Sequence, residues 1–353
     1  MLKLIMIGAL GTMLGPSSEH LKNNPEIKVL RVLDRGSKND QANQFRSAWK
    51  EYGAELVSDL DDLISSGIAF DGIVICAGKN GDDFELIQYL VPKLTPQTFI
   101  LQLSTVSCDF VIKTNQYCQQ YKIDYANYPV TGGMIGAKNA SMLIMASGSK
   151  NLYQRVQALL NSIGKPYYLD ERIETAAATK LLNHILVFYG LVGSINATSL
   201  QARLQDQNHF STSQVALFDF LNQGSGGTRQ WEVALRNGIA HEEWKKGFLL
   251  KHAAIDLIYL LQLMIENQQF LSGVVFLLEL AFSFAFLLQE GLENYATQVL
   301  GLYWLIPEKK QKLSDFLTTY FDPLIGVKKN LEYCLELLPE KFKKSAMLFV
   351  KYD

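Results

Sequence analysis

The sequence contains little cysteine and no C-x-x-C pair. Only four cysteines are scattered among its 353 residues. A chain of this length can bury a sufficient core without covalent cross-links, so these cysteines exclude a disulfide scaffold and indicate a reducing compartment. We therefore expect a cytoplasmic protein.

The sequence also lacks an excess of charge of one sign. Lys and Arg number 33, Asp and Glu number 35, and no stretch combines a basic cluster with aromatic residues. Because partners such as nucleic acid and acidic membrane surfaces usually require a basic patch, we expect neither. The five histidines form no cluster at metal-ligand spacing, so no metal site is expected. With 48% hydrophobic and 19% charged residues, the chain is too apolar to be disordered.

Two apolar stretches raise the question of membrane targeting. Residues 1–14, with an early Lys3, have the pattern of a signal peptide, but they also fit a first buried strand, which we favour. Residues 270–288 are long enough to span a bilayer, yet they contain Glu279, whose insertion would cost about 2.5 kcal/mol or more. We therefore expect a core or subunit-interface helix here and no membrane partner.

Strand and helix signals alternate in the first half of the chain. Short apolar runs occur at residues 2–7, 27–34, 72–77, 98–103, 125–130 and 141–146, and residues 82–94 are amphipathic. This alternation is typical of a mostly parallel sheet covered on both faces. Beyond residue 164 we expect long apolar helices at 175–204, 248–265 and 270–292. The predicted architecture is an α/β Rossmann-type domain (1–164), an all-helical domain (165–303) joined to it by a long helix, and a helical extension (304–353).

The turn after the first strand is the first candidate site. Its sequence G-A-L-G-T-M-L-G (8–15) is looser by one residue at each interval than the dinucleotide-binding pattern G-x-G-x-x-G. Such a turn places backbone N–H groups against a pyrophosphate, although a purely structural turn is equally consistent. Asp34 ends the second strand, where an acidic side chain either accepts the ribose hydroxyls of NAD or caps a turn. Since Arg35, Ser37 and Lys38 follow and could contact a 2′-phosphate, NAD is the favoured cofactor and NADP the alternative.

Several segments, taken in order, resemble the β-hydroxyacid dehydrogenase family, whose best-known type is 3-hydroxyisobutyrate dehydrogenase. I-G-A-L-G-T-M (7–13) is similar to the family's I-G-L-G-x-M-G, and L-S-T-V-S (103–107) to D-x-S-T-I-S. N-Y-P-V-T-G-G (127–133), followed by G-A (136–137), resembles D-A-P-V-S-G-G-x-x-G-A, and K-L-L-N-H (180–184) resembles K-x-x-N-N. G-S-G-G-T-R-Q-W (224–231) and I-D-L (255–257) are similar to later family segments. The ordered set identifies the chain as a divergent member.

The resemblance implies an NAD(P)-dependent oxidoreductase. The expected reaction is hydride transfer between a nicotinamide cofactor and a small 3-hydroxy acid or its semialdehyde or keto form, in a cleft between the two domains. The helical domain is expected to resemble that of 6-phosphogluconate dehydrogenase. The implied cofactor-binding residues are Gly8, Leu10, Gly11, Thr12, Met13, Asp34, Arg35, Ala77, Gly78, Thr105 and Asp256. The implied catalytic residues are Lys180, Asn183, His184 and Thr131, and Thr131, Gly132 and Gly133 are expected to bind the substrate.

The chemistry of these residue types agrees with the implied roles. The hydroxyl of Thr131 and the backbone N–H groups of the two following glycines make a suitable cradle for a substrate carboxylate, although a plain glycine turn is also consistent. Lys180 lies among alanines and leucines, and an amine partly shielded from water can exchange a proton with the substrate oxygen near neutral pH. A lone lysine on a helix is otherwise a solvated surface residue.

The chain departs from the family pattern in ways that leave alternatives open. His184 replaces an Asn, Ile255 replaces a Lys, and the acidic residue before S-T is missing. One alternative is a non-catalytic dinucleotide-binding sensor or scaffold. Another is an imine reductase-like enzyme, which Lys180 disfavours because imine reductases generally replace that lysine. The apolar helices expected at 248–265 and 270–288 predict a homodimer, since one small domain could hardly bury both.

Overall fold

A computed structural model of the protein describes residues 1–65, 67–207, 211–269 and 273–349. The chain forms two compact units. Unit 1 comprises Met1–Lys180 and also takes in the C-terminal segment from Met347, whereas unit 2 comprises Leu181–Ala346. The first boundary therefore lies at Lys180 and not at residue 164. Most of the extension expected from residue 304 belongs to unit 2 and is not separate from it.

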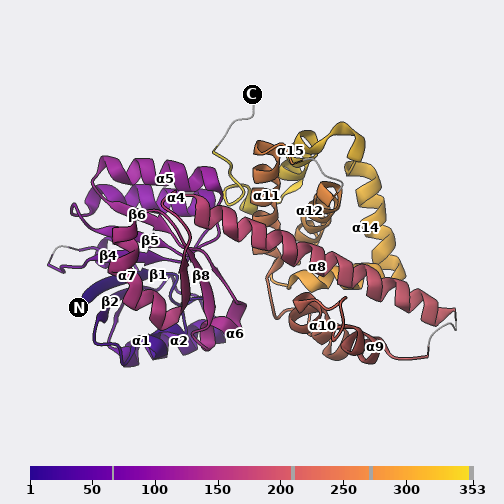
Figure 1. The fold of residues 1–353 in the computed structure, drawn as a ribbon, viewed down its shortest axis with the longest axis horizontal. Helices are drawn as coiled ribbons and strands as arrows, with labels where there is room; N and C mark the ends of the chain where they lie inside the picture. The colour runs from indigo at the N-terminus through magenta and orange to yellow at the C-terminus, as the bar shows by residue number, and fades with distance from the viewer. Residues whose placement is uncertain (66, 208–210, 270–272, 350–353) are drawn as a thin grey trace. The chain divides into compact units, whose positions relative to one another are not determined.

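A six-stranded parallel sheet forms the centre of unit 1 (Figure 1). The strand order is β3-β2-β1-β4-β5-β6, so the order reverses between β1 and β4. In open α/β sheets, ligands bind at this switch point, outside the carboxyl ends of the strands. The predicted Rossmann-type domain is confirmed. The strands are β1 Leu2–Ile7, β2 Ile27–Leu33, β3 Glu55–Val57, β4 Gly72–Ile75, β5 Phe99–Gln102 and β6 Asp124–Asn127.

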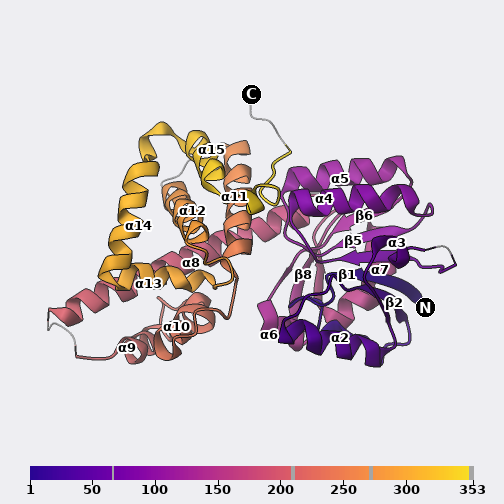
Figure 2. The ribbon, with the colours of Figure 1, turned by 180° about the vertical axis from the view of Figure 1, so that it is seen from behind.

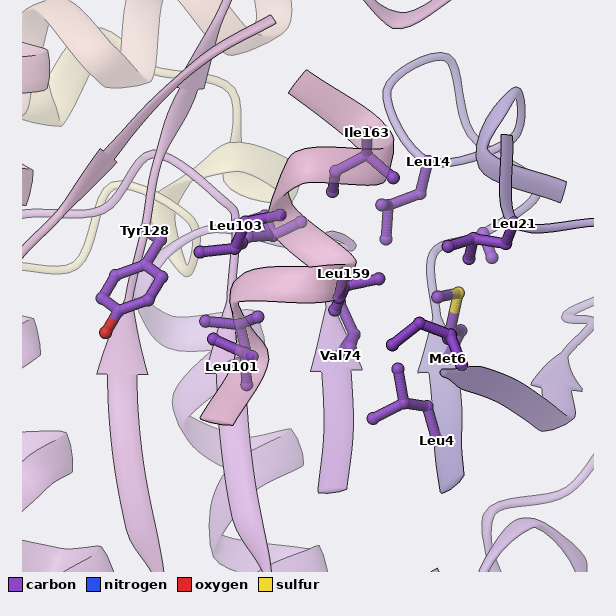
Figure 3. Packing of buried hydrophobic residues seen from close by; sticks show 14 of the residues in the cluster. Leu4, Met6, Leu14, Leu21, Val74, Leu101, Leu103, Tyr128, Leu159 and Ile163 are labelled. Carbon is purple, nitrogen blue, oxygen red and sulfur yellow. The ribbon is translucent and has the colours of Figure 1, made fainter. Parts of the chain in front are cut away.

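Both faces of this sheet are buried, because successive residues of a strand point to opposite sides. On one face, Leu4 and Met6 lie in one apolar cluster with Leu159 of α7 (Figure 3), and α1 and α2 cover the same side. The alternate residues Ile5 and Ile7 are equally buried and point to the opposite face. Helices α4 and α5 lie on the side of the sheet away from α1 and α2 (Figure 1). The helices of unit 1 are α1 Ser17–Leu21, α2 Asp40–Tyr52, α3 Leu60–Leu63, α4 Asn80–Leu90, α5 Cys108–Gln120, α6 Gly133–Lys138 and α7 Lys150–Ile163.

A smaller three-stranded sheet completes unit 1. It consists of β7 (Val130–Thr131), β8 (Met142–Ala146) and β9 (Gly164–Tyr168), with β7 antiparallel and β9 parallel to β8. The prediction of one strand over residues 125–130 is therefore wrong, because the chain leaves the large sheet after Asn127 and enters the small one at Val130. Pro129 lies at this change, where it has no N–H group to extend a ladder.

Unit 2 is helical in its described part (Figure 2). As predicted, one long helix, α8 (Thr175–Asp206), continues from unit 1 into unit 2. By length and composition, α8 is also the one helix among the described residues that could cross a membrane. The other helices are α9 Gln214–Leu221, α10 Arg236–His241, α11 Leu250–Glu266, α12 Gly273–Gln289, α13 Leu300–Leu305, α14 Pro307–Tyr320, α15 Val327–Leu337 and α16 Glu340–Lys343.

Helices α11 and α12 supply most of the core of unit 2. Twelve side chains of α11 and twelve of α12 are buried within this single chain. Most of both helices is therefore covered within one chain, and the expected homodimer stays a prediction. Helix α12 begins at Gly273, and residues 270–272 of the predicted helix lie outside the described residues. Exposed apolar side chains remain at Val275 and Phe276 of α12, and they also occur on α8, where Leu182 and Leu186 lie one turn apart.

Candidate functional site

The glycine turn after β1 makes two close approaches that only glycine allows. Gly8 has a φ of +85°, and a Cβ atom there would lie 2.1 Å from the carbonyl oxygen of Cys76, just after β4. A Cβ atom on Gly15 would lie 2.1 Å from the ring of Phe45 in α2. Gly8 therefore permits the sharp turn beside β4, and Gly15 permits the close packing of α2. Despite its loosened spacing, the turn lies at the switch point of the sheet.

The helix after this turn is shorter than a dinucleotide-binding helix usually is. The chain makes successive turns from Gly8, and α1 begins only at Ser17 and has five residues. Gly11 is exposed, and its neighbours Leu10, Thr12 and Met13 are partly exposed. Any contact with a pyrophosphate would therefore use the accessible backbone of residues 10–13 and not the end of a long helix.

Asp34 follows β2 as expected, but an arginine engages both of its carboxylate oxygens. Arg46 of α2 donates from Nε to Oδ2 at 2.5 Å and from Nη2 to Oδ1 at 2.9 Å. Hydrogen bonding to this guanidinium holds the pKa of Asp34 below its usual value. Sequence reasoning missed Arg46, because nothing local marks a partner twelve residues away. Arg35 and Lys38 are exposed nearby, so the edge around Asp34 carries both signs of charge.

The loops after β4 and β5 bring three of the expected cofactor residues together. Ala77 is exposed in the first loop, and a Cβ atom on Gly78 would lie 2.5 Å from Oδ1 of Asp83. Lys79 of the same loop donates from Nζ to the carbonyl oxygen of Thr105 in the second loop, at 3.4 Å. Ala77, Gly78 and Thr105 therefore meet at the carboxyl ends of two neighbouring strands.

A buried polar network that sequence reasoning did not predict lies beneath these loops. Gln102 donates from Nε2 to Oδ2 of Asp83 at 2.6 Å and accepts a hydrogen bond of 2.5 Å from the hydroxyl of Tyr125. Asn127 donates to the carbonyl oxygen of Ser104 at 3.0 Å, which fixes the start of the β5 loop. Burial raises the pKa of Asp83 to about 6.

Lys180 and the Thr131 loop meet within unit 1. Lys180 is 7% exposed, and its Nζ atom donates a hydrogen bond of 2.8 Å to the carbonyl oxygen of Val130. The next residue, Thr131, is partly exposed, and Gly132 and Gly133 follow with φ values of +129° and +61°. The structure therefore brings together the expected proton-transfer residue and the expected carboxylate cradle.

Lys180 also lies near the glycine turn. Burial raises the pKa of the Cys76 thiol to about 12, and the ammonium groups of Lys79 and Lys180 act in the opposite direction. The amines of Lys79 and Lys180 are therefore close to Cys76, whose carbonyl oxygen lies beside Gly8.

Asn183 and His184 follow on α8 at three- and four-residue spacing from Lys180, so the three lie on one helix face. Nδ2 of Asn183 is buried and has no hydrogen-bond partner among the described residues. This N–H group has a hydrogen bond to give, either to a ligand or to ordered water.

Asp256, for which the resemblance implies a role in cofactor binding, lies beside His184 in unit 2. Its Oδ2 atom lies 3.8 Å from Nδ1 of His184, and both side chains are 3% exposed. The imidazole also lies 5.6 Å, centroid to centroid, from the rings of Phe188 and Phe248. Asp256 therefore pairs with His184 in a buried position, and its expected role in cofactor binding stays a prediction.

These features fit a dinucleotide. Gly8 lets the turn approach the carbonyl group of Cys76 at the switch point, residues 10–13 are at least partly exposed, and charged groups follow β2 where an adenosine ribose binds. The glycine turn would hold the pyrophosphate, and the edge around Asp34 would hold the adenosine ribose. The loops carrying Ala77 and Thr105 would hold the nicotinamide end.

Comparisons with known proteins agree with this geometry. Residues 6–177 match the family model of the NAD binding domain of 6-phosphogluconate dehydrogenase. An uncharacterized oxidoreductase of Synechocystis is 25% identical over 261 residues, which cover 72% of this chain and 83% of that protein. A 2-(hydroxymethyl)glutarate dehydrogenase of Eubacterium barkeri is 25% identical over 227 residues, which cover 64% of this chain and 67% of that protein. The solved structure of a 3-hydroxyisobutyrate dehydrogenase from Salmonella typhimurium shares the fold, with a TM-score of 0.70 and 16% identity. The match covers 85% of this chain and 99% of that one.

Proposed function

We propose that this chain, which resembles the β-hydroxyacid dehydrogenases, transfers hydride between a nicotinamide cofactor and a small 3-hydroxy acid. The observation that carries the proposal is the hydrogen bond of 2.8 Å from Lys180 to the carbonyl oxygen of Val130. It holds a buried amine beside the Thr131 loop, where a substrate carboxylate would bind.

Each group of the proposed site has a separate task. Thr131 and the backbone N–H groups of Gly132 and Gly133 bind the substrate carboxylate. The amine of Lys180 takes the proton of the substrate hydroxyl in oxidation and returns it in reduction. Nδ2 of Asn183 donates a hydrogen bond to the substrate oxygen, and His184 helps to polarise it. A nicotinamide cofactor, held by the glycine turn and the loops carrying Ala77 and Thr105, would supply the hydride acceptor for oxidation of the carbinol carbon to a carbonyl group.

We favour NAD over NADP as the cofactor. A carboxylate at the end of β2 accepts ribose hydroxyls, and Asp34 stands at that position. Asp34 can accept further hydrogen bonds while it binds Arg46, because an ionised carboxylate has about four acceptor sites. The exposed Arg35 and Lys38 are what would favour a 2′-phosphate instead.

We also propose a homodimer in the cytoplasm. Leu182 and Leu186 of α8 are 56% and 74% exposed, and an apolar stripe of this kind is typical of a subunit interface. Light scattering on the purified chain tests the assembly. The proposal predicts twice the mass of one chain, falling to one chain for Leu186→Glu, and a wild-type monomer would contradict it.

Titration with NADH and with NADPH, followed by fluorescence, tests the proposed cofactor site. The proposal predicts that one reduced dinucleotide binds more tightly and that Gly8→Ala weakens binding by about tenfold or more, because its Cβ atom would meet the Cys76 carbonyl. Gly291→Ala is the matched control, since Gly291 also has a positive φ but has open space around it and lies in unit 2. Absence of binding by either dinucleotide would overturn the proposed function.

A further inference from the structure

The end of the described chain binds unit 1 through its backbone. The carbonyl oxygen of Met347 accepts a hydrogen bond of 2.9 Å from Nδ2 of Asn80, and the N–H group of Phe349 donates one of 2.6 Å to Oδ2 of Asp109. Asn80 is fully buried, and Asp109 is partly buried. We call residues 347–349 the C-terminal strap. The side chains of Asn80 and Asp109 fix its path, because each forms a hydrogen bond with a main-chain group of the strap.

The side chain of Phe349 anchors the strap between two helices. Its ring lies 5.0 Å from the ring of Phe84 in α4 and 5.7 Å from that of Phe110 in α5, centroid to centroid. The ammonium group of Lys113 lies 4.8 Å from the centre of the Phe349 ring. Aromatic and cation–π contacts of this geometry are favourable beyond the apolar area that they bury.

The side chains that hold the strap also hold two loops of unit 1 together. Oδ1 of Asn80 accepts a hydrogen bond of 3.1 Å from the N–H group of Ser107, and Nδ2 of Asn80 donates to Oγ of Ser107 at 2.6 Å. Oγ of Ser107 in turn donates to Oδ1 of Asp109. Asn80 follows the β4 loop and Ser107 ends the β5 loop, so the strap and both loops form one hydrogen-bonded set.

These two loops carry Ala77, Gly78 and Thr105, which the proposed function assigns to the cofactor. We propose that the C-terminal strap is a positioning element of the dinucleotide site, because it sets the spacing of the β4 and β5 loops. The inference rests on the proposed function and goes beyond it, since it makes cofactor affinity depend on the C-terminal end of the chain. Without the strap, Asn80 and Asp109 each lose one hydrogen bond beside these loops.

Shortening the chain tests this role directly. A variant ending at Ala346 is titrated with NADH and NADPH beside the full chain, and we expect its Kd to rise about tenfold, as the loss of one or two hydrogen bonds and an aromatic anchor implies. Phe349→Ala is expected to show part of that loss. Met347→Ala is the matched control, because its side chain is 39% exposed and its carbonyl group remains.

Rescue by a peptide separates positioning from a general effect on stability. A synthetic peptide of residues 345–353, added in excess to the shortened chain, is expected to restore its affinity, whereas the peptide carrying Phe349→Ala is not. Equal dinucleotide affinity in the full and shortened chains overturns the inference alone, even if the shortened chain melts at a lower temperature. A loss of affinity that the wild-type peptide does not restore also overturns it. A full chain that binds neither dinucleotide overturns the proposed function as well.

Discussion

The Nζ atom of Lys180 donates a hydrogen bond to the carbonyl oxygen of Val130 at 2.8 Å. This bond joins the first turns of α8 to the short strand β7, whose second residue is Thr131. Because the amine is buried and anchored, its position beside the expected carboxylate cradle is set before any substrate binds. Proton transfer by Lys180 is therefore the part of the proposed reaction that the geometry supports most strongly.

Replacing Lys180 is expected to abolish turnover without abolishing cofactor binding. Removal of a general acid–base group costs about two to four orders of magnitude in rate. We predict that Lys180→Ala loses kcat by this amount, while its Kd for the preferred reduced dinucleotide stays nearly unchanged. Lys180→Arg, which keeps a charge but cannot readily release a proton, should be almost as inactive. Turnover at the wild-type rate in either variant would remove Lys180 from the reaction.

The pair of Asp34 and Arg46 is expected to set the choice between NAD and NADP. Arg46→Ala removes both hydrogen bonds from the guanidinium to Asp34, while Oδ1 keeps the one from the N–H group of Gly36. More acceptor sites are then open to ribose hydroxyls, so the ratio of NADPH to NADH dissociation constants should rise about tenfold. Asp34→Asn removes the repulsion of a 2′-phosphate and should lower that ratio. Titrations of both variants check the prediction, and an unchanged ratio in both would show that this edge does not contact the cofactor.

The raised pKa of Asp83 predicts a specific pH dependence of stability. Burial raises this pKa from 3.8 to about 6, so the folded state binds a proton that the unfolded state has released in this range. The free energy of unfolding should therefore fall by on the order of 3 kcal/mol as pH rises from 3.8 to about 6, and it should level off above that pH.

Asp83→Asn should remove this fall and make the protein more stable at neutral pH. The amide oxygen can still accept the hydrogen bond from Gln102, so the network loses little. Denaturant unfolding at several pH values measures both quantities. If the variant and the wild type keep parallel stability profiles, Asp83 does not titrate in this range.

The pairing of Asp256 with His184 predicts that Asp256 affects turnover through His184 and not through cofactor binding. Because its carboxylate lies 3.8 Å from the buried imidazole, Asp256→Asn should leave dinucleotide affinity unchanged. If His184 polarises the substrate oxygen as proposed, this change should shift the pH profile of turnover. His184→Asn, which restores the family pattern, should make the profile insensitive to the residue at position 256. A clear loss of dinucleotide affinity in Asp256→Asn would return this residue to the cofactor site.

The sequence predicted the elements whose signals are local. The apolar run of residues 2–7 corresponds to β1, and the breaker-poor run from Thr175 corresponds to α8. The run at 125–130 divides between two sheets, because Pro129 cannot extend the ladder and the partner strand of Val130 is distant in sequence. β9 has no signal of its own, since G-K-P-Y-Y neither alternates nor forms an apolar run.

The candidate site was predictable where glycines and the lysine form ordered motifs, and not where side chains from distant segments meet. Arg46, Asp83 and Gln102 carry no motif, and their roles arise only when strands and helices bring them together. The contact between Phe349 and α4 joins residues that are far apart in the chain. Periodicity and spacing report on neighbours within a segment, so partners of this kind become visible only in the folded structure.

The central claim is hydride transfer between a 3-hydroxy acid and the nicotinamide cofactor. The most direct measurement uses 3-hydroxyisobutyrate and 2-(hydroxymethyl)glutarate carrying deuterium at the carbinol carbon, incubated with the full chain and NAD or NADP. The account predicts that at least one substrate gives a reduced dinucleotide heavier by one deuterium, and that Lys180→Ala does not. A chain that binds the dinucleotide but transfers no deuterium from either acid would contradict the account and favour a sensor or scaffold.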